Sequence, residues 1–166
     1  ADATQLPVML YDIPSRSGIP IPEATTIQLA RPPRLVAVQD GKGDLVSSAK
    51  VMSVTDLAYY SGDDAMTLPL MSVGGVGVVG TSTHFSGALT KEWMDLLADG
   101  DHESALEVYR RLLPVYTGVF ATQGCMLVKA GLAARGFNAA VLRRPLKPAS
   151  PSQARTFVQL LEAAGL

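Results

Sequence analysis

The chain has 166 residues, of which 48% are hydrophobic and 17% are charged. That apolar share is enough to form a folded core and excludes a disordered chain. The net charge of −1 and the pI near 6.1 give no basic face, so no nucleic-acid partner is expected. No apolar run approaches the roughly 20 residues of a membrane span, so no membrane partner is expected either. A single cysteine, Cys125, fits a reducing and therefore cytoplasmic setting.

Strand and helix signals alternate along the first part of the chain. Short, β-rich apolar runs occupy Leu6–Ile13, Leu35–Val38, Leu57–Tyr60 and Val76–Gly80. The runs are mostly continuous, which is typical of strands buried on both faces of a parallel sheet. Helix-like stretches separate them at Pro22–Ala30, at Leu45–Met52 behind the N-cap Asp44, and at Ala65–Val73 behind the N-cap Asp64. The pattern predicts four β/α units, an α/β architecture with a parallel sheet.

Only helical signals follow Ser86. The expected helices are Ser86–Asp99, a helix capped by Asp101 that runs beyond Leu112, Cys125–Arg135 closed by Gly136, and a last helix to about Ala164. Ser150 and Gln153 form a capping box at the start of the last helix. We therefore predict a domain of four β/α units at residues 1–100 and a helical domain at residues 101–166.

Four parallel strands do not complete a closed barrel, which needs eight in roughly 250 residues. Four units alone expose sheet edges and an interior rich in Val, Leu and Ile. We expect that a complementary half-barrel chain supplies the rest, that the four units self-associate with a copy of themselves, or that the chain is a fragment.

Residues that can carry chemistry follow each expected strand, where barrel enzymes place their catalytic groups. Four segments in order, VMLYDIPSRSG, VAVQDGKGDL, YYSGDDA and GGVGVVGTST, resemble the C-terminal half of the dihydrodipicolinate synthase and N-acetylneuraminate lyase family of class I aldolases. The resemblance is strongest to actinobacterial members and continues through the helical tail. It implies strands five to eight of a (β/α)8 TIM barrel plus a C-terminal helical tail, and a pyruvate-dependent lyase activity in lysine biosynthesis.

The resemblance assigns roles to individual positions. Tyr11 matches the tyrosine that relays protons to and from the imine, a task that suits a hydrogen-bonded phenol. Arg16 matches the arginine that holds a substrate carboxylate, for which a guanidinium fork is well shaped. Val79 matches the residue whose backbone carbonyl faces pyruvate.

One position departs from the family pattern. Gln39 stands where the family has the lysine that forms a Schiff base with pyruvate. An imine requires a neutral, nucleophilic amine, and the delocalised nitrogen of a carboxamide cannot form one. Gln39 can still hydrogen-bond a keto acid. Lys42, three residues further on, is expected to face elsewhere. The family's Gly-Thr-Thr carboxylate cradle and the tyrosine given by a neighbouring subunit belong to parts absent from this sequence.

Three hypotheses follow. The chain is a lyase component whose other half is a separate polypeptide, inactive alone. Alternatively, it is a non-catalytic pseudoenzyme or regulatory subunit that binds a keto acid or a partner half-barrel. In the third, it is a truncated aldolase in which Gln39 is an acquired or engineered change, and Gln39→Lys restores activity only with the missing half.

The remaining polar residues are interpreted as structural. Asp63 and Asp64 are expected to cap a helix, and Asp40 to anchor a loop. His84 and His102 lie too far apart for a metal site, so no metal or other cofactor is expected. Cys125 and Lys129 are expected to pack on their helix. Gly74–Gly75 is expected to allow tight packing between a helix and a strand.

Overall fold

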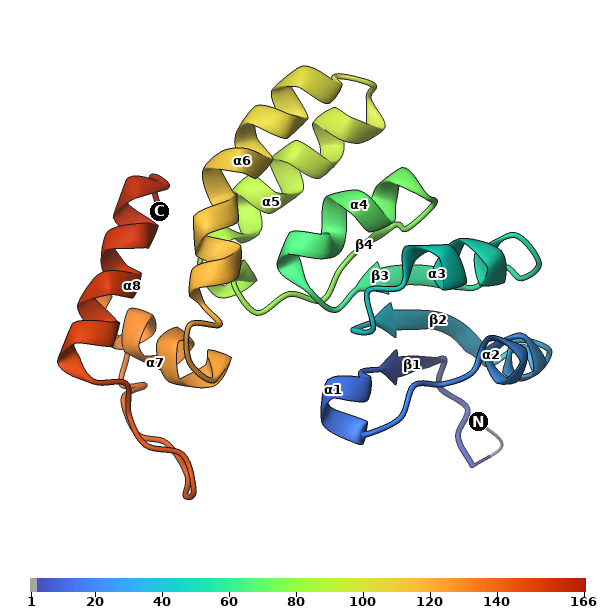
Figure 1. Ribbon diagram of the computed structural model, residues 1–166, viewed down its shortest axis with the longest axis horizontal. Coiled ribbons are helices and arrows are strands. Elements are labelled where there is room, and N and C mark those ends of the chain that lie inside the picture. The colour runs from blue at the N-terminus through green and yellow to red at the C-terminus, as the bar shows by residue number, and fades with distance from the viewer. Residues whose placement is uncertain (1–2) are drawn as a thin grey trace. The chain divides into compact units, whose positions relative to one another are not determined.

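The computed structural model describes residues 3–166 and contains two compact units, Ala1–Gly80 and Thr81–Leu166. The first unit holds a sheet and its covering helices, and the second is built of helices (Figure 1). The fold is therefore α/β with a parallel sheet followed by a helical tail, as the sequence predicts. Within the described residues, no helix combines the length and hydrophobicity that crossing a bilayer would require.

The sheet has four parallel strands in the order β1-β2-β3-β4. Their bounds are β1 Val8–Asp12, β2 Leu35–Asp40, β3 Ala58–Ser61 and β4 Gly77–Val78. The connecting helices are α1 Pro14–Ser17, α2 Glu23–Leu29, α3 Leu45–Met52, the 3-10 helix η1 Asp64–Met66 and α4 Thr67–Ser72. Each strand overlaps one of the predicted apolar runs, so all four predicted strands are confirmed.

Two aspartates cap helices of this unit. Asp44 accepts a hydrogen bond from the Ser47 amide at 3.0 Å and caps α3, as predicted. Of the two aspartates expected to cap the next helix, Asp63 is confirmed, because it accepts from the Ala65 amide at 2.9 Å, and the prediction of Asp64 as the N-cap is wrong. Asp63 has the extended backbone that an N-cap requires, with φ −126° and ψ 121°, whereas Asp64 is already the first residue of η1.

The core of the first unit lies on one face of the sheet. Residues from strands and helices form a single buried cluster, comprising Leu35, Val38, Val51, Leu57, Tyr59 and Leu70. Gly75 lies in close contact with Leu70 of α4, since a Cβ at Gly75 would lie 2.6 Å from the Leu70 side chain. Helices α2, α3 and α4 all contribute side chains to or beside this cluster.

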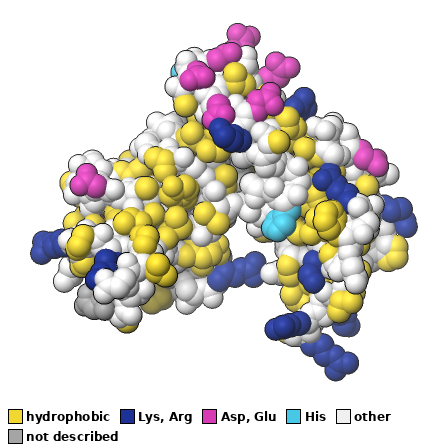
Figure 2. Space-filling model, turned by 180° about the vertical axis from the view of Figure 1, so that it is seen from behind, with side chains coloured by type: hydrophobic (Ala, Val, Ile, Leu, Met, Phe, Trp, Pro, Cys, Tyr) yellow, Lys and Arg dark blue, Asp and Glu magenta, His cyan; other side chains and the backbone are white. Residues whose placement is uncertain are grey.

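The other face of the sheet is uncovered in this chain. Met9 is 40% exposed and Tyr11 is 47% exposed, although both lie within β1. Figure 2 shows hydrophobic side chains gathered in a broad area over this unit, on the left of the view. The sequence predicts strands that are buried on both faces of the sheet. Within this chain, the strands are buried on one face only.

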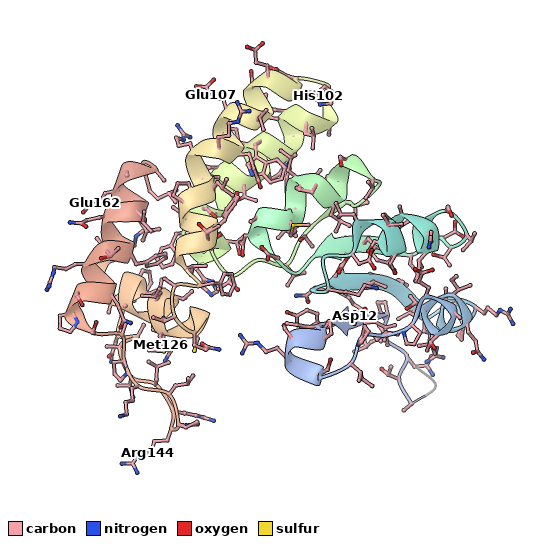
Figure 3. The ribbon with its side chains drawn as sticks, in the orientation of Figure 1. Asp12, His102, Glu107, Met126, Arg144 and Glu162 are labelled. Carbon is pink, nitrogen blue, oxygen red and sulfur yellow. The ribbon has the colours of Figure 1, made fainter. Side chains whose placement is uncertain are left out.

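The second unit contains α5 Thr83–Ala98, α6 His102–Gly118, α7 Gly124–Ala134 and α8 Pro151–Ala163. The predicted Asp101 cap and the capping box of Ser150 and Gln153 are both present. Tyr116 organises the core of this unit, because its hydroxyl oxygen receives the Trp93 indole N–H at 3.0 Å and lies 2.8 Å from the Thr90 hydroxyl. Figure 3 labels His102 and Glu107 on α6, and both belong to the outer side of that helix.

Helix α5 begins at Thr83, three residues before the predicted start at Ser86. It packs against α6, so the compact units divide at Gly80. The sequence-based division at residue 100 follows β/α units, in which a helix belongs to the strand before it. The two divisions thus differ only in where α5 is placed. Lys129 on α7 donates to the backbone oxygen of Val141, a structural role as expected.

Candidate functional site

Strand register brings two of the predicted site residues side by side. Tyr11 of β1 pairs with Gln39 of β2, and Gln39 pairs with Tyr60 of β3. Each residue stands one position before the carboxyl end of its strand. Adjacent strands lie about 4.8 Å apart, and residues in register project from the same face. Tyr11, Gln39 and Tyr60 therefore form a row, called here the polar row, on the uncovered face of the sheet.

The sequence analysis missed Tyr60. Its signal is positional: Tyr60 precedes the polar residue Ser61 at the end of its strand, just as Tyr11 precedes Asp12 and Gln39 precedes Asp40. This similarity identifies Tyr60 as a site residue only when the ends of the strands are known to lie side by side. The pairing of Gln39 with Tyr60 between β2 and β3 shows that they do.

Arg16 and Val79 lie at the same edge of the sheet as the polar row, but not within it. Arg16 is exposed on α1, directly after β1. Val79 directly follows β4 and is 46% exposed. Its backbone N–H donates to the backbone oxygen of Ser61 at 2.8 Å. Among residues 3–166, Arg16 has no carboxylate partner, so its guanidinium is free to meet a ligand.

The opposite face at the same level carries a second row, Asp12, Asp40 and Ser61, which is buried. Asp40 accepts hydrogen bonds from the amides of Lys42 and Gly43, each at 2.9 Å, and from the Ser48 hydroxyl at 2.6 Å. It anchors the loop after β2, as predicted. The Ser61 hydroxyl donates a hydrogen bond to the backbone oxygen of Asp63 at 2.6 Å. This row is therefore occupied by internal contacts.

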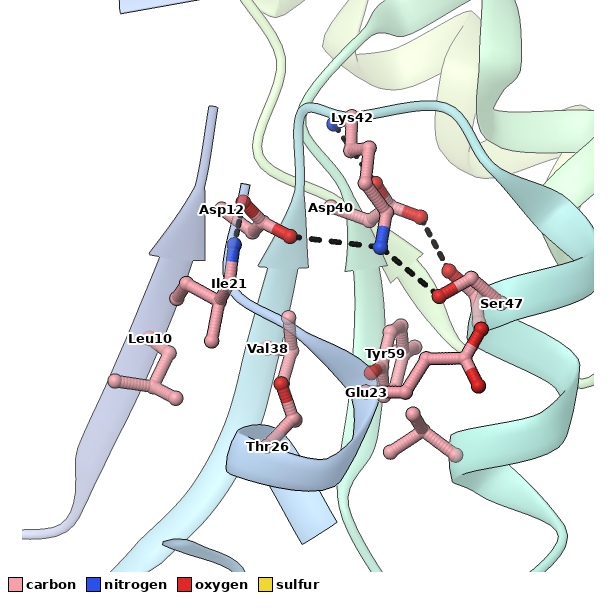
Figure 4. Close-up of a pocket in the computed structure, with 12 residues that line it drawn as sticks. Leu10, Asp12, Ile21, Glu23, Thr26, Val38, Asp40, Lys42, Ser47 and Tyr59 are labelled. Carbon is pink, nitrogen blue, oxygen red and sulfur yellow. Dashed lines mark hydrogen bonds and ion pairs between the residues drawn. The ribbon is translucent and has the colours of Figure 1, made fainter. Parts of the chain in front are cut away.

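The side chain of Lys42 lies on the same face of the sheet as the buried row, and not on the face of the polar row. Its Nζ lies 3.6 Å from Asp12 Oδ2 and donates to the Ser47 hydroxyl at 3.0 Å (Figure 4). Asp12 also accepts the Ile21 amide through Oδ1 at 3.0 Å. Because Asp12 and Gln39 point to opposite faces of the sheet, the amino group of Lys42 lies on the face opposite to Gln39.

The space around this network is too small for a substrate. The cavity lined by Asp12, Asp40, Lys42 and Tyr59 has a free volume of about 10 Å³. A single water needs at least that much room. The Asp12–Lys42 pair therefore ties the end of β1 to the loop after β2 and to the first turn of α3, and it binds no ligand of its own.

Tyr59 packs beneath the helices beside these carboxylates and is 4% exposed. Burial disfavours the charged phenolate, and the negative charges of Asp40, Asp12 and Glu23 add to the effect. Together they raise the pKa of the Tyr59 phenol from 10.0 to about 12. Tyr59 is thus a buried phenol that stays protonated near neutral pH.

Comparison with known proteins gives a consistent result. The model of the dihydrodipicolinate synthetase family matches residues 1–164. The chain is 56% identical over its whole length to 4-hydroxy-tetrahydrodipicolinate synthase from Cutibacterium acnes, and covers 57% of that enzyme. It is 49% identical over 99% of its length to the synthase from Acidothermus cellulolyticus, and covers 54% of it.

Solved structures show the same partial coverage. The chain superimposes on dihydrodipicolinate synthase from Bacillus anthracis with a TM-score of 0.92 and 31% identity, covering 97% of this chain and 56% of that one. It matches the enzyme from Cyanidioschyzon merolae, solved with lysine bound, with a TM-score of 0.92 and 36% identity over 96% of this chain and 55% of that one. The chain therefore spans about half the length of the relatives it matches.

The half-buried position of Lys42 predicts a stability effect. Lys42→Met removes the ion pair with Asp12 and the hydrogen bond to Ser47, and should lower the free energy of unfolding by about 1–3 kcal/mol. Lys50→Met is the matched control, because its pair with Glu23 is exposed and worth less than about 1 kcal/mol. Urea unfolding of both variants tests this. Equal losses would show that burial adds nothing to the Asp12–Lys42 pair.

The raised pKa of Tyr59 predicts alkaline destabilisation. The folded state favours the protonated phenol, so this stability is fully present below pH 10 and is lost as the pH rises from 10 to 12. The loss is at most about 3 kcal/mol for a shift of this size. Tyr59→Phe should flatten this part of the curve, whereas Tyr60→Phe should leave the Tyr59 contribution intact. Unfolding free energies measured up to pH 12 decide between these outcomes.

Proposed function

Since the chain belongs to the dihydrodipicolinate synthetase family, we propose that it is a half-barrel component of a pyruvate-dependent lyase of the 4-hydroxy-tetrahydrodipicolinate synthase type. The observation that carries the proposal is the polar row, which lies at the carboxyl ends of the strands where barrel enzymes hold their substrates. A cytoplasmic location is part of the proposal and rests on the single free cysteine, Cys125.

The proposed ligand is a small 2-keto acid such as pyruvate. A related synthase from Acinetobacter baumannii, 25% identical to this chain, has been solved in complex with pyruvate. In this chain, Tyr11 offers a phenol for hydrogen bonding and proton transfer, and Arg16 offers a guanidinium fork for a carboxylate. Val79, whose position matches the family residue with a backbone carbonyl facing pyruvate, follows β4 at the same edge of the sheet. These assignments are carried over position by position from the family pattern.

Gln39 limits what the site does. The carboxamide donates and accepts hydrogen bonds but forms no imine, so the chain binds a keto acid without activating it covalently. Lys42 does not compensate, because its amino group is engaged on the opposite face by Asp12 and Ser47. This feature favours the second candidate function, a non-catalytic or regulatory subunit that retains binding after the loss of the nucleophile.

The proposed macromolecular partner is a complementary half-barrel of four β/α units. Two features support it. The uncovered face of the sheet presents apolar side chains, including Met9, where a closed barrel would place its interior. Strands β1 and β4 are both edge strands in this chain, so each has one side free to pair. Self-association of two copies would use the same face and is the competing outcome.

The absence of imine chemistry is tested by borohydride trapping. The chain, alone and mixed with the N-terminal half of the Cutibacterium acnes synthase, is incubated with pyruvate, reduced and weighed by mass spectrometry. No pyruvyl adduct is expected, because Gln39 has no free amine. Gln39→Lys should gain one adduct in the mixture, and Gln39→Met should gain none. An adduct on the unaltered chain would overturn the proposal.

The complementary partner is tested by native mass spectrometry. The chain mixed with that N-terminal half should give a one-to-one complex. Met9→Lys, which places a charge on the uncovered face, should weaken it at least tenfold because the charge would be buried. Val46→Lys, on the exposed surface of α3, is the control and should have no effect. A homodimer that excludes the added half would contradict the heteromeric arrangement.

A further inference from the structure

Two consecutive tyrosines of β3 lie in opposite environments. Tyr59 belongs to the buried cluster beneath the helices. Tyr60 is half-buried and, by strand alternation, projects from the uncovered face. The hydrophobic core of the first unit accounts for Tyr59 but not for Tyr60. A large aromatic side chain with a polar tip at this place needs another explanation.

The register gives Tyr60 a specific position. Tyr60 pairs with Gln39 on one side and with Gly77 on the other. It therefore flanks Gln39 from the side opposite to Tyr11. Gly77 has no side chain, so no side chain of β4 stands next to Tyr60 within the same row. A ligand held at Gln39 would lie between two phenols.

The chemistry of the polar row indicates what it binds. Within residues 3–166, none of the side chains of Tyr11, Gln39 and Tyr60 has a hydrogen-bond partner, whereas Asp12, Asp40 and Ser61 on the opposite face are all bonded. Two hydroxyls and one carboxamide supply hydrogen-bond donors without an opposing carboxylate. Such donors suit the carbonyl and carboxylate oxygens of a small anionic acid.

We infer that Tyr60 is a third ligand-contacting residue of the site, donating its hydroxyl to an oxygen of a bound 2-keto acid beside Gln39. The inference rests on the proposed function and deepens it, because it assigns a binding role to a residue to which the family resemblance assigned none. With the imine lost at Gln39, affinity depends on hydrogen bonds of this kind, and Tyr60 supplies one of them.

The test uses a chimera in which the N-terminal half of the Cutibacterium acnes synthase precedes the full chain. Pyruvate binding is measured by calorimetry for the chimera and for two variants. Tyr60→Phe should weaken binding about tenfold, the effect expected for one hydrogen bond to a charged group. Tyr59→Phe makes the same chemical change at the neighbouring residue on the opposite face, and should alter affinity less than about twofold.

A second measurement keeps the role of Tyr60 separate from folding. Fluorine NMR of the chimera labelled with fluorotyrosine should show the Tyr60 resonance shifting on addition of pyruvate and the Tyr59 resonance unchanged, and melting temperatures report any loss of stability. A chimera that binds no pyruvate at all overturns the proposed function and this inference with it. Binding that is unaffected by Tyr60→Phe, or a Tyr60 resonance that pyruvate does not shift, overturns this inference alone.

Discussion

Parallel pairing of β1, β2 and β3 with coincident ends is the constraint on which the rest of the first unit depends. It places Tyr11, Gln39 and Tyr60 on one face, and Asp12, Asp40 and Ser61 on the other. A shift of one residue in any strand would exchange the two faces. The hydrogen bonds of Asp40 to the loop after β2 oppose such a shift, because they require its carboxylate to stay on the helical side.

The two faces differ in how their polar groups are satisfied. On the helical face, Asp12 and Asp40 are buried with bonded partners, as buried charges must be. On the other face, Met9 and Tyr11 remain exposed. The first face gives the sheet its stability. The second is the surface from which both proposed interactions, with a keto acid and with a complementary half-barrel, arise.

The contrast between Gln39 and Lys42 separates binding from catalysis. Under the proposed assignment, the family's chemistry needs a free amine on the uncovered face, and Gln39, in register with Tyr11 and Tyr60, carries a carboxamide. The nearest amine in the sequence is committed to an ion pair and a hydrogen bond on the other side of the sheet. Under this proposal Lys42 does not replace the nucleophile, although it is close to Gln39 in the sequence, and the proposed site offers hydrogen-bonding groups.

The amino-acid sequence by itself determined the local features of this protein. The four strands, the Asp44 cap and the capping box at Ser150 all follow from patterns within a few residues. Only the tertiary structure decided that α5 groups with α6, that Lys42 pairs with Asp12, and that Tyr60 stands beside Gln39. These outcomes depend on register and packing between segments distant in the chain, and local pattern carries no information about either.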